Sequence, residues 1–118
     1  MKTTIKSILK ATDTLARLAG RTLPVKQSYR LAKLVRAVDA ELTVYNGERI
    51  KLCDRYGTVN AEKTNYDIND WDGFNRGINE LQSQEVELDV KPIDIDGLEL
   101  SAQDIIDIEP FIEVVDDD

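Results

Sequence analysis

The amino-acid sequence predicts an α+β fold: a long antiparallel helical hairpin plus a third helix and a small antiparallel β-hairpin or meander with a short C-terminal helix. Apolar residues recur at helical spacing through the first half of the chain and alternate with acids from residue 85 onward. The length of 118 residues is typical of one domain. Residues 1–113 are therefore expected to form a single α+β domain, with residues 114–118 as an acidic, frayed C-terminal tail.

The first two helices are predicted from apolar periodicity and from residues that favour helix ends. The first helix is expected to run from Thr3 or Thr4 to Ala19, where Gly20 would end it. Pro24 suits the first turn of the second helix, because a backbone N–H would be unpaired there anyway. One arc of this helix carries Leu31, Leu34, Val35, Val38, Leu42 and Tyr45. Two amphipathic helices with a short connection should pack as an antiparallel hairpin.

The second helix is expected to continue to Tyr56 and to end at Gly57. Gly47 then lies inside the helix, where glycine costs about 1 kcal/mol relative to alanine. A break at Asn46-Gly47 is the alternative, since Asn-Gly is a strong turn signal between strands. The single cysteine, Cys53, falls on the apolar side of this helix, where a buried structural thiol is expected.

Residues 58–70 are polar and lack periodicity, and we interpret them as a loop. Asn69 or Asp70 would cap a third helix after this loop. The apolar residues of that helix are Trp71, Phe74, Ile78 and Leu81. Apolar residues and acids then alternate over residues 85–90, which predicts a strand with one acidic, solvated face.

The Asp-Gly pair at residues 96–97 lies between alternating segments and predicts a two-residue β-hairpin. Pro92, just before it, favours an edge strand or a loop. Ser101 stands three residues before Asp104, as in a helix capping box. Pro110 should end the short helix that follows.

Charge is distributed unevenly along the chain. The net charge is −8, but residues 1–40 carry +7 and residues 41–118 carry −15. After Gln84, the single base Lys91 stands against thirteen acids. The asymmetry predicts a basic face for an anionic partner, an acidic face for a basic partner, or two parts that neutralise each other. Solvated helix faces with an acidic tail are the simpler alternative.

Residue types for common catalytic chemistry are missing or isolated. The sequence has no histidine, which removes the usual general base and the usual metal ligand. Its six glycines form no phosphate-binding loop. The segments DWDG at residues 70–73 and DIDG at residues 94–97 lack the first acid and the final Glu of an EF-hand. We therefore expect a protein that is not an enzyme, with no catalytic residue, no metal site and no cofactor.

Two charged surfaces are candidate interaction sites. The basic surface lies on the outside of the second helix and consists of Lys26, Arg30, Lys33 and Arg36. These side chains could contact nucleic-acid phosphates, although the amphipathic pattern alone would place them there. The acidic surface lies on the strand near residue 87 and consists of Glu85, Glu87 and Asp89. Its carboxylates could imitate a row of phosphates, or they could protect a strand edge from aggregation.

Three stretches form a recognisable pattern: LPVKQSYRLAKLVRAVDAEL, the CDRYG at the end of the long helix, and INELQSQEVELDVKPIDIDGLELSAQDIIDIEPFI. In this order they resemble a group of small uncharacterised proteins encoded by tailed bacteriophages and prophages. The match spans residues 20–57 and 78–113 and carries no catalytic residue. Asn46-Gly47 departs from the continuous charged helix of that pattern. The resemblance implies a viral protein that is made in a bacterial cytoplasm and works by protein contact.

The leading hypothesis is a non-enzymatic bacteriophage structural or assembly protein that contacts itself or another virion component. One alternative is a small phage inhibitor of a host nucleic-acid enzyme or defence factor, acting through its acidic face. Another is nucleic-acid binding through the basic helix face. The expected partner is a protein, either a second copy or another phage or host protein, rather than nucleic acid or a membrane. The expected location is the host bacterial cytoplasm, or the virion.

Overall fold

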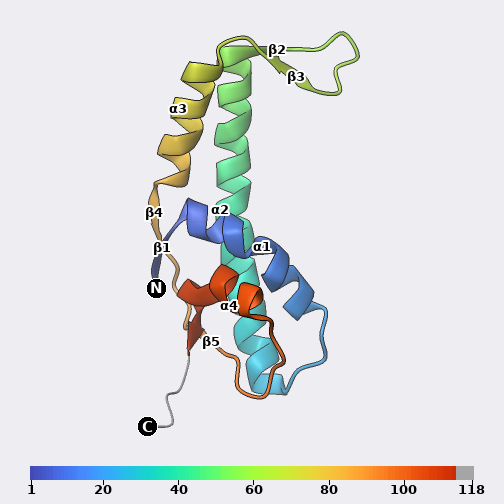
Figure 1. The fold of residues 1–118 in the computed structure, drawn as a ribbon, viewed down its shortest axis with the longest axis vertical. Helices are drawn as coiled ribbons and strands as arrows, with labels where there is room; N and C mark the ends of the chain where they lie inside the picture. The colour runs from blue at the N-terminus through green and yellow to red at the C-terminus, as the bar shows by residue number, and fades with distance from the viewer. Residues whose placement is uncertain (114–118) are drawn as a thin grey trace.

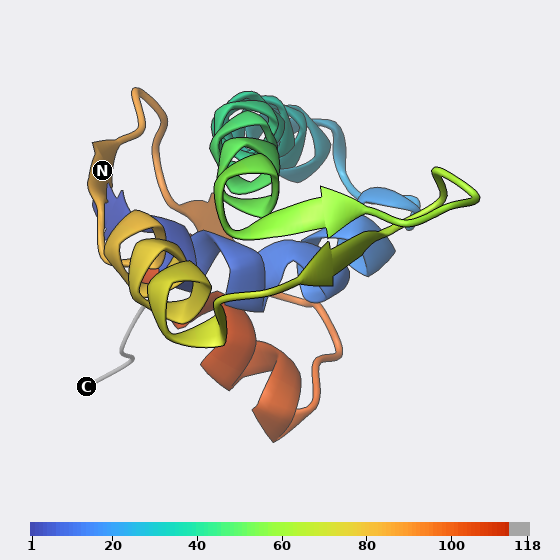
Figure 2. The ribbon, with the colours of Figure 1, turned by 90° about the horizontal axis from the view of Figure 1, so that it is seen from above.

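The long helix α2 (Val25–Tyr56) runs the length of the molecule, and the other elements pack along it (Figure 1). The computed structural model describes residues 1–113. Helix α1 (Ile5–Ala19) crosses the lower half of α2, and α3 (Trp71–Gln82) lies beside its upper half. Helix α4 (Ala102–Ile108) packs on the other side of α1, as Figure 2 shows. The predicted α+β class is confirmed, because short strand pairs accompany these helices.

The molecule has two parts, a base and an arm. The base comprises residues 1–40 and residues 85–113, and it contains α1, the first half of α2 and α4. The arm comprises residues 41–82, and it contains the second half of α2, a β-hairpin and α3 (Figure 1).

Local signals set the ends of the first two helices close to the predicted residues. Helix α1 begins at Ile5 rather than at Thr3 or Thr4, and Pro24 lies just before α2 rather than in its first turn. Thr4 caps α1 by accepting a hydrogen bond from the backbone N–H of Ser7 at 3.2 Å. Helix α1 ends where Gly20 follows, and α2 begins directly after Pro24. The connection between them is short, so the two helices pack against each other as a helical hairpin.

Helix α2 is continuous through Asn46-Gly47, so the prediction of one long helix is confirmed and the alternative break is wrong. Gly47 is exposed, and a Cβ at this position would have no neighbour within 4 Å. Tyr45 and Cys53 lie on the opposite side of the helix and are buried. Their burial on either side of the glycine offsets its low helix propensity.

The hydrophobic core lies in the base, where α1, the first half of α2 and the C-terminal segment meet. Ile8, Leu34, Ile108 and Phe111 are completely buried and come from three different parts of the chain. Only Tyr45 of the core cluster belongs to the arm.

The arm is built on a close contact between α3 and α2. Asp70 caps α3, as predicted, by accepting from the backbone N–H of Gly73 at 3.0 Å. A Cβ on Gly73 would lie 2.5 Å from the ring of Tyr56, and a Cβ on Gly77 would lie 2.7 Å from Leu52. The two glycines therefore allow α3 to approach α2 more closely than any larger residue would.

The small antiparallel β-hairpin lies in the arm, where the sequence does not predict it. Strand β2 (Gly57–Val59) pairs with β3 (Tyr66–Ile68), so the interpretation of this segment as a loop is wrong for both strands. Polar groups close the turn. The side-chain oxygen of Asn60 accepts a hydrogen bond from the backbone N–H of Thr64 at 3.0 Å. The backbone N–H of Asn60 donates to the backbone carbonyl of Asn65 at 2.9 Å. Such bonding needs no apolar alternation, which is why the pattern misses the hairpin.

The Asp-Gly pair at residues 96–97 forms a turn, but the predicted hairpin around it is wrong. The backbone N–H of Leu98 donates to the carbonyl of Ile95 at 3.1 Å, and the turn glycine has a φ of +78°. Strand β5 (Ile93–Asp94) pairs instead in parallel with β6 (Ile112–Glu113). The reason is burial, because Leu98 packs against the core rather than along a neighbouring strand.

The predicted strand in the acidic segment is confirmed only at its start. Strand β4 (Glu85–Glu87) pairs antiparallel with β1 (Lys2–Thr4), a strand that the sequence does not predict. Residues 88–90 have no strand structure, and the chain bends at Val90. Val86 is half-buried between two exposed glutamates, so β4 does present an acidic face.

The C-terminal helix follows its predicted signals. Ser101 and Asp104 form both hydrogen bonds of a capping box at the start of α4. The α-helix ends before Pro110 and continues as the 3₁₀ turn η1 (Glu109–Phe111). The predicted tail at residues 114–118 lies outside the described residues.

Candidate functional site

The opposite charges of the two chain ends meet in the base. Ion pairs join residues 1–30 to residues 87–113, and they are Arg17–Asp104 (2.7 Å), Arg30–Glu113 (3.8 Å) and Met1 ammonium–Glu87 (3.0 Å). Of the three interpretations of the charge asymmetry, mutual neutralisation is the one that the described residues display.

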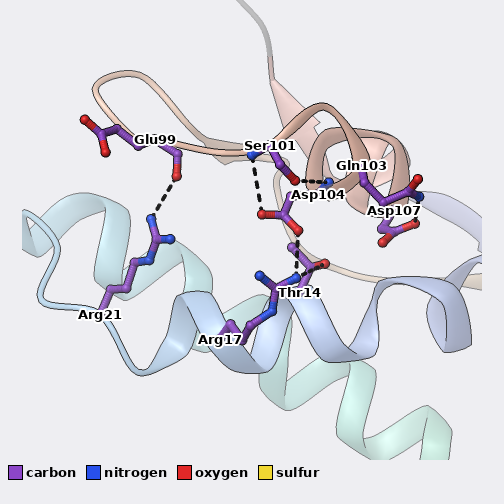
Figure 3. Close-up of polar contacts among 8 residues, drawn as sticks. All are labelled: Thr14, Arg17, Arg21, Glu99, Ser101, Gln103, Asp104 and Asp107. Atoms are coloured by element: carbon purple, nitrogen blue, oxygen red, sulfur yellow. Dashed lines mark hydrogen bonds and ion pairs between the residues drawn. The ribbon is translucent and has the colours of Figure 1, made fainter.

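The pair between Arg17 and Asp104 anchors α4 to α1 (Figure 3). Arg17 Nη2 donates to Asp104 Oδ1 and, at 3.2 Å, to Thr14 Oγ1. The Asp104 side chain is only 12% exposed and also takes part in the capping box with Ser101. The hydrogen bond from Arg17 is the main cause that lowers the pKa of Asp104, opposed by its burial. The same bond raises the pKa of Arg17.

Further hydrogen bonds from the N-terminal part hold the segment before α4. Arg21 Nη1 donates to the backbone carbonyl of Glu99 at 3.0 Å, also drawn in Figure 3. Gln27 Nε2 donates to the carbonyls of Asp94 (3.1 Å) and Asp96 (2.9 Å). Arg21 and Gln27 therefore serve contacts within the chain.

The four predicted basic residues lie exposed along the outside of α2, but they do not share one environment. Arg30 and Lys33 line a groove of about 680 Å³ between α2 and residues 87–91. Lys26 and Arg36 do not line it. Arg36 instead borders a smaller hollow of about 240 Å³ near the junction of α1 and α2.

The three predicted acidic residues are also divided by the structure. Glu85 and Glu87 are exposed on β4, opposite Thr4 and Lys2 of β1. Glu87 contacts the N-terminal ammonium, so part of its charge is neutralised within the chain. Glu87 and Asp89 line the groove beside α2, whereas Glu85 does not.

The groove thus brings together half of the predicted basic surface and most of the acidic one. Its complete lining is Met1, Tyr29, Arg30, Lys33, Glu87, Leu88, Asp89, Val90 and Lys91. Tyr29 is 61% exposed, and Lys33 Nζ lies 4.9 Å from the centre of its ring. Among residues 1–113, neither Lys33, Lys91 nor Asp89 takes part in an ion pair.

Sequence reasoning missed Lys91 and the N-terminal ammonium as members of this site. The sequence could have indicated Lys91 as a candidate, because it is the only base after Gln84. Tyr29 and Lys33 are four residues apart on one helix, a spacing that brings side chains together. The position of residues 87–91 beside α2 had no such signal.

Other reactive groups are held in structural contacts. The lone thiol of Cys53 is buried on α2, as expected. Tyr66 donates its hydroxyl to Asp54 at 2.7 Å, and this bond is the main cause that raises the pKa of Tyr66. Within residues 1–113, no three His, Cys, Asp or Glu side chains are grouped in a way that could hold a metal ion. In the same part of the chain, no helix combines the length and apolar character needed to cross a membrane.

Comparison of the chain with protein-family models, with curated proteins and with solved structures finds no match. Function is therefore inferred from the geometry of the described residues and from the sequence.

Proposed function

We propose that this protein is a non-enzymatic bacteriophage structural or assembly protein that acts by contact with itself or with another virion component. The phage context rests on the resemblance of three sequence stretches to small phage and prophage proteins. Production in the host bacterial cytoplasm, with the virion as a second location, belongs to the same proposal.

The observation that carries the proposal is a set of three large apolar side chains that are exposed on the arm. Val44, Ile50 and Trp71 are 63%, 45% and 58% exposed, and all three lie on helices. Large apolar side chains are frequent in protein interfaces, and tryptophan contributes strongly to their binding energy. Their exposed fractions show that the other described residues leave these side chains largely uncovered.

The two alternatives have weaker support in the geometry. An acidic face that imitates phosphates needs a row of unpaired carboxylates, but Glu87 is paired with the N-terminal ammonium and faces Lys2. Nucleic-acid binding needs a continuous basic surface, but Arg30 lies beside Glu113 and shares its groove with Asp89. Both alternatives remain distinguishable by experiment.

Mass spectrometry of purified virions and light scattering during size-exclusion chromatography test the proposal. We expect the wild type to be present in virions or to self-associate. A Val44→Ser/Trp71→Ser variant should weaken this contact, because two of the three exposed apolar side chains are removed. Val25→Ser is the matched control, since Val25 is 84% exposed but lies in the base.

The salt dependence of association is informative as well. Association through the apolar arm should persist between about 50 and about 500 mM salt, whereas contacts between surface charges weaken as the Debye length shrinks. A protein that is absent from virions and monomeric at both salt concentrations would overturn the proposal.

A further inference from the structure

The groove between α2 and residues 87–91 differs in charge from the rest of the molecule. Its lining contains four cationic groups and two carboxylates, although the whole chain carries a net charge of −8. One cation, the Met1 ammonium, is already paired with one carboxylate, that of Glu87. The remaining lining is therefore cationic, with Arg30, Lys33 and Lys91 around a single unpaired acid, Asp89.

One basic residue of the groove, Arg30, lies near a carboxylate of this chain that does not line the groove. Glu113 Oε2 lies 3.8 Å from Arg30 Nη1, which is beyond hydrogen-bond distance. The guanidinium can therefore still donate a hydrogen bond to a closer carboxylate. Arg30 and Glu113 both retain about half of their side-chain exposure, at 43% and 57%. Lys33 extends over the exposed face of Tyr29, so a cation and an aromatic surface are presented side by side.

The opposite wall offers unpaired backbone groups. Leu88 exchanges both of its backbone hydrogen bonds with Met1. Beyond it, the backbone groups of residues 89–91 make no hydrogen bond to another described residue. Exposed amides and carbonyls beside a groove are the usual means of holding an extended peptide.

The geometry points to this groove as a binding site for an extended acidic segment of a partner protein. Carboxylates of the segment contact Lys33 and Lys91, an apolar side chain packs on Tyr29 and Val90, and its backbone pairs with residues 89–91. Charge complementarity selects the occupant, since the unpaired groups of the lining are mainly cationic. The inference deepens the proposed function, on which it rests, by naming the chemistry of one partner contact.

A peptide fits this lining better than a nucleic acid does. A phosphate backbone would bring Glu87 and Asp89 close to a continuous row of negative charge, which costs binding energy. A peptide can place its carboxylates at Lys33 and Lys91 and turn a backbone N–H toward Asp89. The volume of about 680 Å³ is within the range of sites that bury a short segment or a small ligand.

Fluorescence anisotropy with a labelled Glu-Val-Val-Asp-Asp-Asp peptide tests the inference on the full-length protein. This sequence combines acidic and apolar residues, and its uncharged counterpart Gln-Val-Val-Asn-Asn-Asn is the control probe. We expect only the acidic peptide to bind, with an affinity that falls as salt is raised from about 50 to about 500 mM. An oligothymidylate of about 20 nucleotides is the competing nucleic-acid probe.

The chain provides a matched pair of variants for this experiment. Arg30→Glu/Lys33→Glu should weaken peptide binding about tenfold or more. Lys26→Glu/Arg36→Glu makes the same change in net charge on the same helix, but outside the groove. We expect this control to change the affinity less than about threefold, because only long-range electrostatics are altered.

Three results would overturn the inference. They are no binding of the acidic peptide, equal loss of affinity in both double variants, and tighter binding of the oligothymidylate than of the peptide. These results concern the groove alone. If virion association or self-association through the arm is observed but no peptide binds, the groove inference fails while the proposed function stands.

Discussion

The base and the arm share the helix α2, but they surround it differently. In the base, α1 and residues 85–113 cover α2, and the completely buried residues of the core lie there. In the arm, α3 and the β-hairpin contact α2, and among the described residues Tyr45 is the one arm residue of the buried core cluster. The difference shows that one helix can belong to a stabilising core at one end and to an exposed surface at the other. The buried core is thus concentrated in one part of the chain, and the other part leaves more of α2 exposed.

The largest expected effect comes from removing a core aromatic side chain in the base. Phe111→Ala should lower the free energy of unfolding by about 3–5 kcal/mol, because Phe111 is completely buried and its loss leaves a cavity. Trp71→Ala in the arm removes a larger side chain that is 58% exposed and meets Phe74 edge to face. It should cost about 1 kcal/mol or less. Urea denaturation followed by circular dichroism measures both values.

The opposite order of the two stability losses would contradict the difference between base and arm. A larger cost for Trp71→Ala than for Phe111→Ala would mean that the arm, rather than the base, holds the cooperative core. Equal slopes of the two transitions with urea are the control, because a changed slope would indicate a different extent of unfolding.

How well the sequence predicts this fold depends on whether the signal is local. The ends of α1, α2 and α4 follow residues such as Thr4, Gly20 and Ser101, whose effect is exerted within a turn of the helix. The pairing of β1 with β4 joins residues more than 80 positions apart and has no local signal. The turn of the hairpin at residues 57–68 is closed by hydrogen bonds of the Asn60 side chain to Thr64, which apolar alternation does not describe.

The same limit applies to the candidate site. The sequence does indicate that Lys26, Arg30, Lys33 and Arg36 share the outside of α2, because helical spacing fixes the side of a helix. It does not separate Arg30 and Lys33 from the other two, since that depends on where residues 87–91 cross α2. The grouping of a basic helix face with Asp89 and Lys91 is a property of tertiary structure alone.

An intermediate effect is expected for the ion pair that closes the base. Asp104→Asn should lower the thermal unfolding midpoint at about pH 7, because Arg17 loses its carboxylate partner. The pKa of Asp104 is lowered in the folded state, chiefly by the hydrogen bond from Arg17. Its ionic contribution is therefore present above the ordinary aspartate pKa of about 4, and it is lost as the pH falls through the lower folded-state pKa.

The gap in midpoint between wild type and Asp104→Asn should therefore narrow as the pH is reduced from about 7 to about 3. Asp107→Asn is the matched control on the same helix. Asp107 accepts a hydrogen bond from Gln103 at 2.9 Å and forms no ion pair among the described residues. A gap for Asp104→Asn that stays constant over this pH range would show that packing or capping, rather than charge, gives Asp104 its role.

The smallest expected effects are those of alanine at two helical glycines of the arm, where the free energy of unfolding should change in opposite directions. Gly73→Ala should destabilise the protein by about 1 kcal/mol, because the new Cβ would lie 2.5 Å from the ring of Tyr56 and force α3 away from α2. Gly47→Ala should stabilise it by about 0.5–1 kcal/mol, since the methyl group enters open space and alanine favours the helix. Chemical denaturation of the two variants measures the signs.

The glycine pair locates the close contact of the arm more sharply than either variant alone. Both substitutions add one methyl group to a helix, so helix propensity favours alanine at both positions. An opposite sign at the two positions then reports what the methyl group meets, which is the Tyr56 ring and the Asp70 carboxylate at one position and open space at the other. If both variants are stabilised, the close contact between α3 and α2 at Gly73 is wrong.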